Sequence, residues 1–137
     1  MKKAILSGLL AGLVMLVLGL AVGRLFDLFA PGLVAEYNNP ALFRPWSDPL
    51  MSLYFLQPFL VALILAWFWT KLKGLVRGTN ALEKGLFFGL AYWLLIIPGM
   101  LMTYSSFPLS LLIVFSWTVI ALIQGLAAGW IFAKMLK

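Results

Sequence analysis

The strongest constraint on the fold is an uncharged stretch, 4–23, which contains twenty residues and no Asp, Glu, Lys or Arg. A helix of that length, at about 1.5 Å per residue, reaches across a hydrocarbon core roughly 30 Å thick. The stretch is also longer than the apolar core of a secretory signal, which is usually about 7–15 residues. We therefore expect a membrane span rather than a cleaved signal.

The composition of the whole chain agrees with a membrane environment. Of the 137 residues, 64% are hydrophobic and 10% are charged, which is more apolar side chain than a soluble domain can bury. The chain has no cysteine and no histidine, and this excludes disulfides, thiolate nucleophiles and histidine-based metal or acid–base chemistry. We expect no metal site and no cofactor.

Three further apolar stretches, 50–70, 85–104 and 109–133, are also long enough to span a membrane. Together with 4–23 they predict an all-α fold, a four-helix transmembrane bundle that forms a single integral membrane domain. Pro58 should bend the second span, and Pro98-Gly99 should break the third near its far end.

The segment 24–49 between the first two spans cannot cross a membrane. It contains three of the four acidic residues and four of the seven prolines, together with turn-forming pairs such as Pro31-Gly32. Its Phe, Leu and Val side chains make it too apolar for a free linker. We expect a folded outer cap at the membrane interface, with room for a short amphipathic helix.

The positive charges predict the orientation of the bundle. If both termini are cytoplasmic, eight of the ten Lys and Arg residues lie at inner ends of spans, and only Arg24 and Arg44 lie outside. We therefore predict an N-in/C-in protein of a bacterial-type inner (plasma) membrane. The net charge of +6 does not indicate nucleic-acid binding, because no basic stripe or aromatic platform lies outside the spans.

A weak internal similarity links the two halves of the chain. Gly8-Leu-Leu-Ala-Gly-Leu matches Gly85-Leu-Phe-Phe-Gly-Leu, and Ala66-Trp-Phe-Trp-Thr-Lys resembles Gly129-Trp-Ile-Phe-Ala-Lys. The similarity is typical of two parallel-repeat helical hairpins related by an axis along the membrane normal. It would also arise if separate spans had converged on common membrane-protein patterns.

Eight of the twelve glycines occur in GxxxG pairs, which allow helix backbones to approach closely in membranes. The four pairs lie in three of the four spans and are Gly8/Gly12, Gly19/Gly23, Gly85/Gly89 and Gly125/Gly129. We favour helix packing within one bundle, since the pairs can satisfy one another. Dimerisation through an outward glycine face is the alternative.

The best candidate ligand-binding residues lie in the outer cap, where charged and aromatic side chains can line a cavity. They are Arg24, Asp27, Glu36, Tyr37, Arg44, Trp46 and Asp48. Two neighbouring carboxylates there would permit acid–base catalysis or binding of a hard cation. The two arginines can neutralise two of the three acids, so we favour an ion-paired, partly solvated cap and expect no catalytic residue.

Gln57 and Gln124 are the most polar side chains deep within the spans, and both are further candidates for ligand contact. Gln57 precedes Pro58, so its amide can bond the carbonyl that the proline frees, which we expect to be that of Tyr54. Gln124 can instead bond a Ser or Thr on another helix.

These observations favour a non-enzymatic membrane protein, either an accessory or scaffold subunit or a binder of a lipid-like molecule. A lipid binder should have an apolar pocket open sideways to the bilayer beneath Phe43 and Trp46. The alternative is a small transporter or channel assembled as a homo-oligomer, whose water-filled path should touch Gln57 or Gln124. A membrane-surface enzyme that uses the outer carboxylates is a weaker hypothesis. The expected partners are the lipid bilayer and either a second copy or a membrane partner protein.

Overall fold

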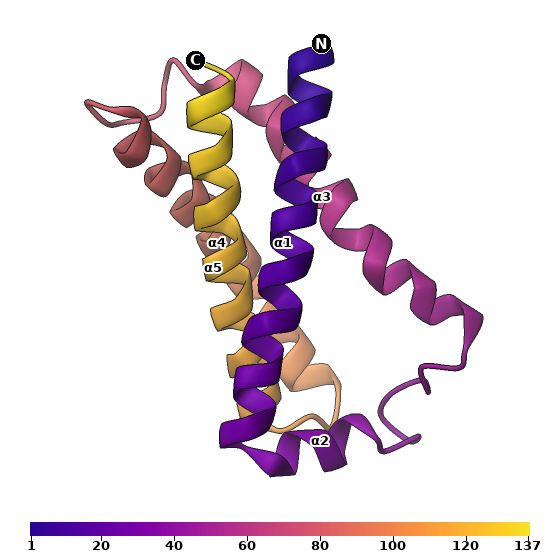
Figure 1. Ribbon diagram of the computed structural model, residues 1–137. Coiled ribbons are helices and arrows are strands. Elements are labelled where there is room, and N and C mark those ends of the chain that lie inside the picture. The colour runs from indigo at the N-terminus through magenta and orange to yellow at the C-terminus, as the bar shows by residue number, and fades with distance from the viewer.

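The computed structural model describes residues 1–137 and is built from helices, turns and loops, with no strand. Figure 1 shows the five α-helices, which are α1 (Lys2–Phe29), α2 (Pro31–Tyr37), α3 (Leu53–Leu72), α4 (Ala81–Ser106) and α5 (Leu111–Met135). A short 3-10 helix, η1 (Pro49–Ser52), leads into α3. Helices α1, α4, α5 and the η1–α3 unit are long and apolar enough to cross a membrane. The predicted all-α fold with four candidate spans is therefore confirmed.

The helices extend beyond the predicted spans because they end at caps and prolines rather than at the first charge. Helix α1 continues through 24–29 and ends just before Pro31, which starts α2 at a position where a missing N–H costs nothing. Helix α4 begins after Asn80, whose side chain accepts a hydrogen bond from the Glu83 N–H at 3.0 Å. Helix α5 begins in the same way after Ser110, which accepts from Ile113 at 3.2 Å.

Neither interior proline interrupts its helix. Pro58 lies inside α3 and Pro98 lies inside α4, and both helices continue through these positions. The predicted break at Pro98-Gly99 is therefore wrong. A proline removes one backbone hydrogen bond, whereas unwinding would expose several more polar groups to hydrocarbon, so a span tolerates the single loss.

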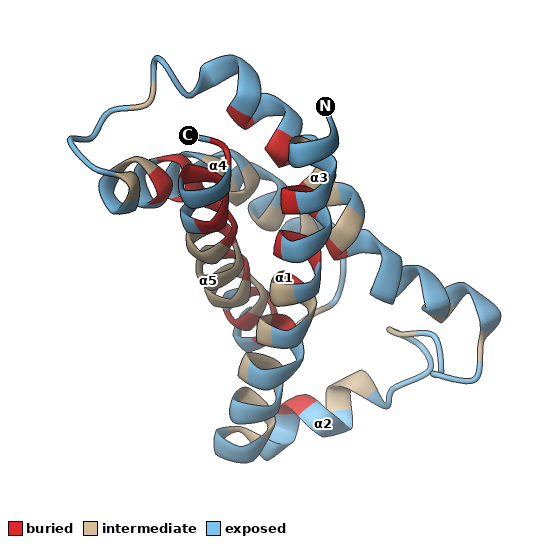
Figure 2. Ribbon diagram, turned by 45° about the horizontal axis from the view of Figure 1, so that its top comes forward, coloured by how far each residue is buried: buried red, intermediate tan, exposed pale blue.

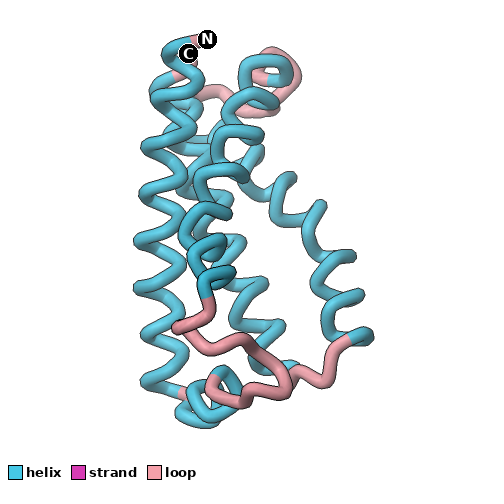
Figure 3. The backbone as a smooth tube through the Cα atoms, turned by 90° about the vertical axis from the view of Figure 1, so that its right-hand side faces the viewer, coloured by secondary structure: helices cyan, strands magenta, loops and turns pink.

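Helix α1 packs against both α3 and α5, so it lies between them. Helices α4 and α5 form a second close pair. Figures 1 and 3 show both termini at one end of the bundle, together with the 73–80 loop; we call this the terminal end. The opposite end holds α2, the 38–48 loop and the 107–110 turn, and we call it the cap end. Figure 1 also shows α3 diverging from the other helices toward the cap end.

The main hydrophobic core lies toward the terminal end. Its centre is an aromatic stack in which Phe88 of α4 meets Trp69 of α3 and Phe132 of α5 edge to face, at centroid distances of 5.2 and 6.3 Å. The Trp69 indole N–H also donates to the Leu136 carbonyl at 3.3 Å. Figure 2 shows buried residues on the facing sides of α1 and α5, while the first turns of α3 are exposed. Much of the remaining apolar surface can therefore face lipid.

Candidate functional site

The cap is anchored to the first turns of α5 by two polar contacts. Glu36 Oε1 accepts a hydrogen bond from the Ser110 N–H at 2.7 Å, and the Trp117 indole N–H donates to the Tyr37 hydroxyl at 2.7 Å. Leu33, also on α2, is 1% exposed. The carboxylate of Glu36 also lies at the positive N-terminal end of α5, where an anion is stabilised. Helix α2 is thus a docked element.

Aromatic rings extend this anchor into the 38–48 loop. Phe43 packs between Tyr37, at a centroid distance of 5.2 Å, and Trp117, at 6.1 Å. Burial raises the pKa of the Tyr37 phenol above its ordinary value, although the hydrogen bond from Trp117 opposes the shift. Tyr37 is therefore neutral at physiological pH, and its hydroxyl adds no charge to the cap.

A cavity of about 300 Å³ lies beside Phe43 and Trp117. Its wall is mainly apolar, and comes from the 38–48 loop, from α4 and from the 107–110 turn; the remaining lining residues are Ala41, Leu42, Thr103, Phe107, Pro108 and Leu109. The polar side-chain atoms on the wall are already paired, since Thr103 donates to the Gly99 carbonyl at 2.9 Å and Trp117 to Tyr37. Such a wall suits a small apolar group and offers little to a charged one.

The pocket is placed differently from the one that the sequence suggested. Phe43 lines it, but Trp46 does not: its indole packs against Tyr54 and Phe55 of α3, at 5.4 and 6.1 Å. The loop therefore divides its aromatic residues between two helices. This cavity lies beside Phe43 alone and not beneath both residues, because Tyr37 and Trp117 hold Phe43 on the α5 side.

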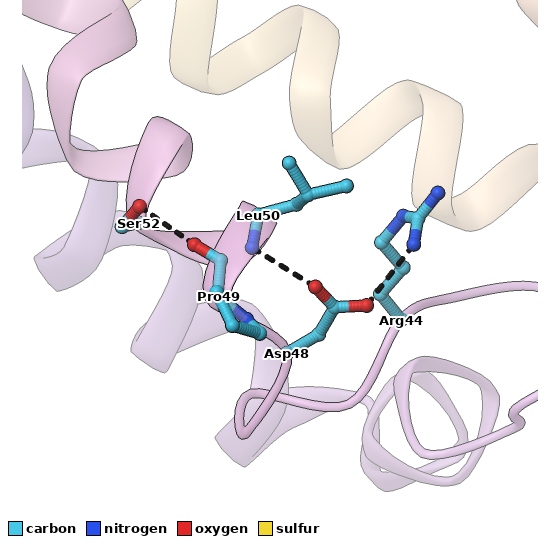
Figure 4. A network of polar contacts seen from close by, with 5 residues as sticks. All are labelled: Arg44, Asp48, Pro49, Leu50 and Ser52. Atoms are coloured by element: carbon cyan, nitrogen blue, oxygen red, sulfur yellow. Dashed lines mark hydrogen bonds and ion pairs between the residues drawn. The ribbon is translucent and has the colours of Figure 1, made fainter.

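The three outer carboxylates do not form one cluster. Asp27 lies 4.0 Å from Arg24, whose side chain is 86% exposed, so the pair is weak. Asp48 pairs with Arg44 at 3.0 Å and also accepts from the Leu50 N–H at 2.9 Å, as Figure 4 shows. These contacts, the Leu50 N–H first, hold the pKa of the Asp48 carboxyl below its ordinary range. Glu36 is bonded to α5, and no group of three potential metal-binding side chains occurs.

The two glutamines have different environments, and neither has the predicted partner. Gln124 donates to the backbone carbonyl of Met15 on α1 at 2.7 Å, rather than to a Ser or Thr. This contact is available because Gly19 leaves room beside the amide; a Cβ at Gly19 would lie 2.7 Å from Gln124 Nε2. Gln57 is exposed on α3, and its side-chain amide forms no hydrogen bond within the chain. The expected bond to the Tyr54 carbonyl is therefore absent.

The glycines of α4 and α5 face each other. A Cβ at Gly85 would lie 2.7 Å from the Gly129 carbonyl oxygen, and a Cβ at Gly89 would collide with the Gly125 carbonyl. Added Cβ atoms at Gly125 and Gly129 would collide in turn with α4. The two backbones are therefore in direct contact along this seam.

The glycines of α1 are shared between two neighbours. Gly8 faces Leu63 and Gly12 faces Phe59, both on α3, with added Cβ positions 2.9 and 2.8 Å from those residues. Gly19 faces α5, and Gly23 has no atom within 4 Å of its Cβ position.

Sequence reasoning missed Trp117, Phe107 and Ser110. An aromatic residue inside a span is usually a packing residue, so Trp117 carried no separate signal. Ser110 did carry one, because a serine just before an apolar run is a typical helix N-cap. Comparison of the chain with protein-family models, with curated proteins and with solved structures gave no match. The geometry therefore carries the functional argument.

Proposed function

We propose that this chain is a non-enzymatic integral membrane protein that binds a lipid-like hydrophobic molecule in the cavity at the cap end. The observation that supports the proposal is the cavity itself: about 300 Å³, apolar, and bordered by Phe43 and Trp117. Phe107 on its wall is 59% exposed, so the cavity opens to the surroundings of the protein. A short acyl, prenyl or aromatic group has the size and polarity that such a wall accommodates.

The charge distribution supports an orientation in which this cavity faces the outer leaflet. The terminal end carries eight Lys and Arg residues, while the cap end carries only Arg24 and Arg44. Because cytoplasmic loops are enriched in positive charge, we place both termini in the cytoplasm of a bacterial-type inner membrane. The ligand would then be a molecule that reaches the outer half of that membrane.

One observation favours a second candidate, an accessory subunit that binds a partner helix. Residues Leu53 through Gln57 at the start of α3 are all exposed, and the Gln57 amide has no partner within the chain. A polar amide in hydrocarbon is stabilised by an interhelical hydrogen bond, which a second helix could supply. The transporter alternative has less support, since neither Gln57 nor Gln124 lines the cap-end cavity or a cavity of about 550 Å³ at the terminal end.

Native mass spectrometry of the protein released gently from its own membrane tests the main proposal. Ala41→Trp places an indole in the cavity, and Ala35→Trp makes the same change on α2 at an exposed position that does not line it. We expect the wild-type chain and Ala35→Trp to retain one molecule of defined mass, and Ala41→Trp to lose it. Equal retention by both variants, or a bare wild-type monomer, would contradict the proposal.

A co-purifying membrane protein would instead support the second candidate. Its loss with Gln57→Leu, and its retention with Gln124→Leu, would place the partner on α3.

A further inference from the structure

A second, larger cavity lies at the terminal end, on the opposite side of the membrane from the cap-end cavity. Its volume is about 550 Å³, and its floor is formed by Trp69, Ala133 and Leu136, all of which are nearly fully buried. Its rim is polar, and includes Lys73, Lys84 and Lys137 together with Thr79 and Asn80 at the start of α4. The cavity thus combines an apolar base with a cationic rim.

The rim presents hydrogen-bond donors, whereas its side-chain acceptors are already used. Lys84 and Lys137 form no side-chain hydrogen bond or ion pair within the chain. Lys73 donates to the carbonyls of Leu136 and Lys137, at 3.2 and 2.8 Å, and keeps its charge and a third proton. The Asn80 side-chain oxygen accepts from the Glu83 N–H, and its amide donates to the Thr79 hydroxyl at 3.5 Å, which leaves one amide proton for another partner.

No Asp or Glu side chain lines the cavity. Glu83 is the one acidic residue at this end of the chain, and it does not line the cavity. Its Oε2 accepts from both the backbone N–H and the hydroxyl of Thr79, at 2.7 and 2.8 Å. Three lysine ammonium groups and one Asn80 amide proton around this cavity are therefore available to an anion.

We infer that this cavity binds a phosphate group, and specifically the kind carried by an anionic phospholipid headgroup or by free phosphate. The terminal end of a span lies at headgroup level, where the lysines meet the phosphate. The buried floor beside Trp69 offers apolar contact to the glycerol and upper acyl carbons of a lipid, which free phosphate lacks. This inference does not depend on what occupies the cap-end cavity.

The test measures binding of phosphatidylglycerol to the full chain in detergent by native mass spectrometry, with phosphatidylcholine as the neutral lipid. Lys84→Gln is the principal variant, because Lys84 makes no hydrogen bond in the chain that the substitution would break. Lys71→Gln is the matched control: it removes the same charge at the same end, from an exposed position outside the cavity. Inorganic phosphate binding is followed separately by phosphorus NMR.

We expect phosphatidylglycerol to be preferred over phosphatidylcholine, and Lys84→Gln to weaken its binding about fivefold, the size typical of one lysine at an anionic surface. Lys71→Gln should change it less than twofold. If phosphatidylglycerol is not preferred but inorganic phosphate binds and is lost in Lys84→Gln, the inference holds with free phosphate as the source. Equal losses in the two variants would overturn it, since the preference would then reflect total charge alone. Absence of binding by both probes would also overturn it.

Discussion

The two helical pairs of this protein, α4/α5 and α1/α3, use the same glycine motif with different results. In α4/α5, Gly85 and Gly89 meet Gly125 and Gly129, so glycine lies opposite glycine and the backbones touch. In α1/α3, the two α1 glycines that face α3 lie close to the Cα atoms of Leu63 and Phe59, so glycine on one helix lies opposite larger residues on the other. Only the first pair is a seam made by both helices.

The difference explains why α3 diverges toward the cap end. The contact of α1 glycines with α3 stops at Gly12 and Phe59, because Gly19 faces α5 and Gly23 faces no neighbour. Pro58 lies at this point, and the α3 residues before it are exposed. A GxxxG motif therefore predicts close packing only as far as the partner helix offers small residues or matching side chains.

The strongest test of the comparison is Gly89→Val in the α4/α5 seam. The new side chain would enter the Gly125 backbone, which cannot move aside without separating the helices. We expect the free energy of unfolding to fall by about 3 kcal/mol or more, at or beyond the upper end of overpacking effects. Unfolding in a denaturing detergent titration measures the change.

Gly99→Ala in the same helix is the control, because its Cβ position has no atom within 4 Å. It should be neutral or stabilising, since alanine favours helix. Gly12→Val should fall between the two variants, because the exposed start of α3 leaves that helix freer to shift. A Gly12→Val cost equal to that of Gly89→Val would show that the two pairs are equivalent.

Substitutions of the two glutamines test, with smaller expected effects on stability, which helix stabilises the position of α1. Gln124→Leu removes the hydrogen bond from α5 to the Met15 carbonyl of α1, and we expect a loss of about 1 kcal/mol, typical of an interhelical hydrogen bond in a membrane. Gln57→Leu on α3 breaks no bond within the chain and should leave the isolated protein unchanged or slightly more stable. The same unfolding titration distinguishes them, and the reverse ranking would contradict the account.

The cap should be coupled to α5 more than to α3. A double-mutant cycle with Tyr37→Phe and Trp117→Phe removes the 2.7 Å hydrogen bond between cap and α5, and we expect a coupling free energy of about 0.5–1 kcal/mol. Trp46→Ala, which removes aromatic contacts to α3 from an exposed ring, should cost less than Tyr37→Phe. The opposite order would mean that the cap belongs to the α1/α3 pair.

The smallest expected effect concerns η1, the short helix that leads into α3 and is capped by Asp48. Since the pKa of Asp48 is lower in the folded protein than its ordinary value, the ionised carboxylate stabilises the fold at neutral pH. That stabilisation should be lost as the pH falls below about 4, through the folded-state pKa. Thermal unfolding between about pH 3 and 6 should show this slope in the wild type and a flatter profile in Asp48→Asn.

Four helices, their approximate positions and a cap with a short helix could be predicted, because these depend on run length, charge and turn residues. The course of α3 could not, because it depends on which residues oppose each α1 glycine. A glycine pattern identifies the contact residues on one helix, but not the residues of the other helix that face them. The sequence alone does not show whether Gly19 faces Gln124 of α5 or a residue of α3.

None of the nine ligand-binding candidates from the sequence lines the cap-end cavity, although some of their local pairings could be predicted. Asp27 and Asp48 each pair with one of the two arginines, as expected from the two arginines available to the three acids. Glu36 and Tyr37 have partners more than seventy residues away, Ser110 and Trp117, and local patterns do not report such pairs. The cavity beside Phe43 depends on those long-range contacts, and so its position could not be derived from the cap alone.

Photo-crosslinking in the native membrane tests most directly whether the cap-end cavity holds a specific molecule. A benzoylphenylalanine at Phe107 lies on the cavity wall, and the same residue at Leu95, which is 80% exposed on α4, samples the surrounding lipid. We expect one dominant adduct mass at Phe107, and adducts with the mixed lipids of the bilayer at Leu95. The same lipid mixture at both positions would contradict the account.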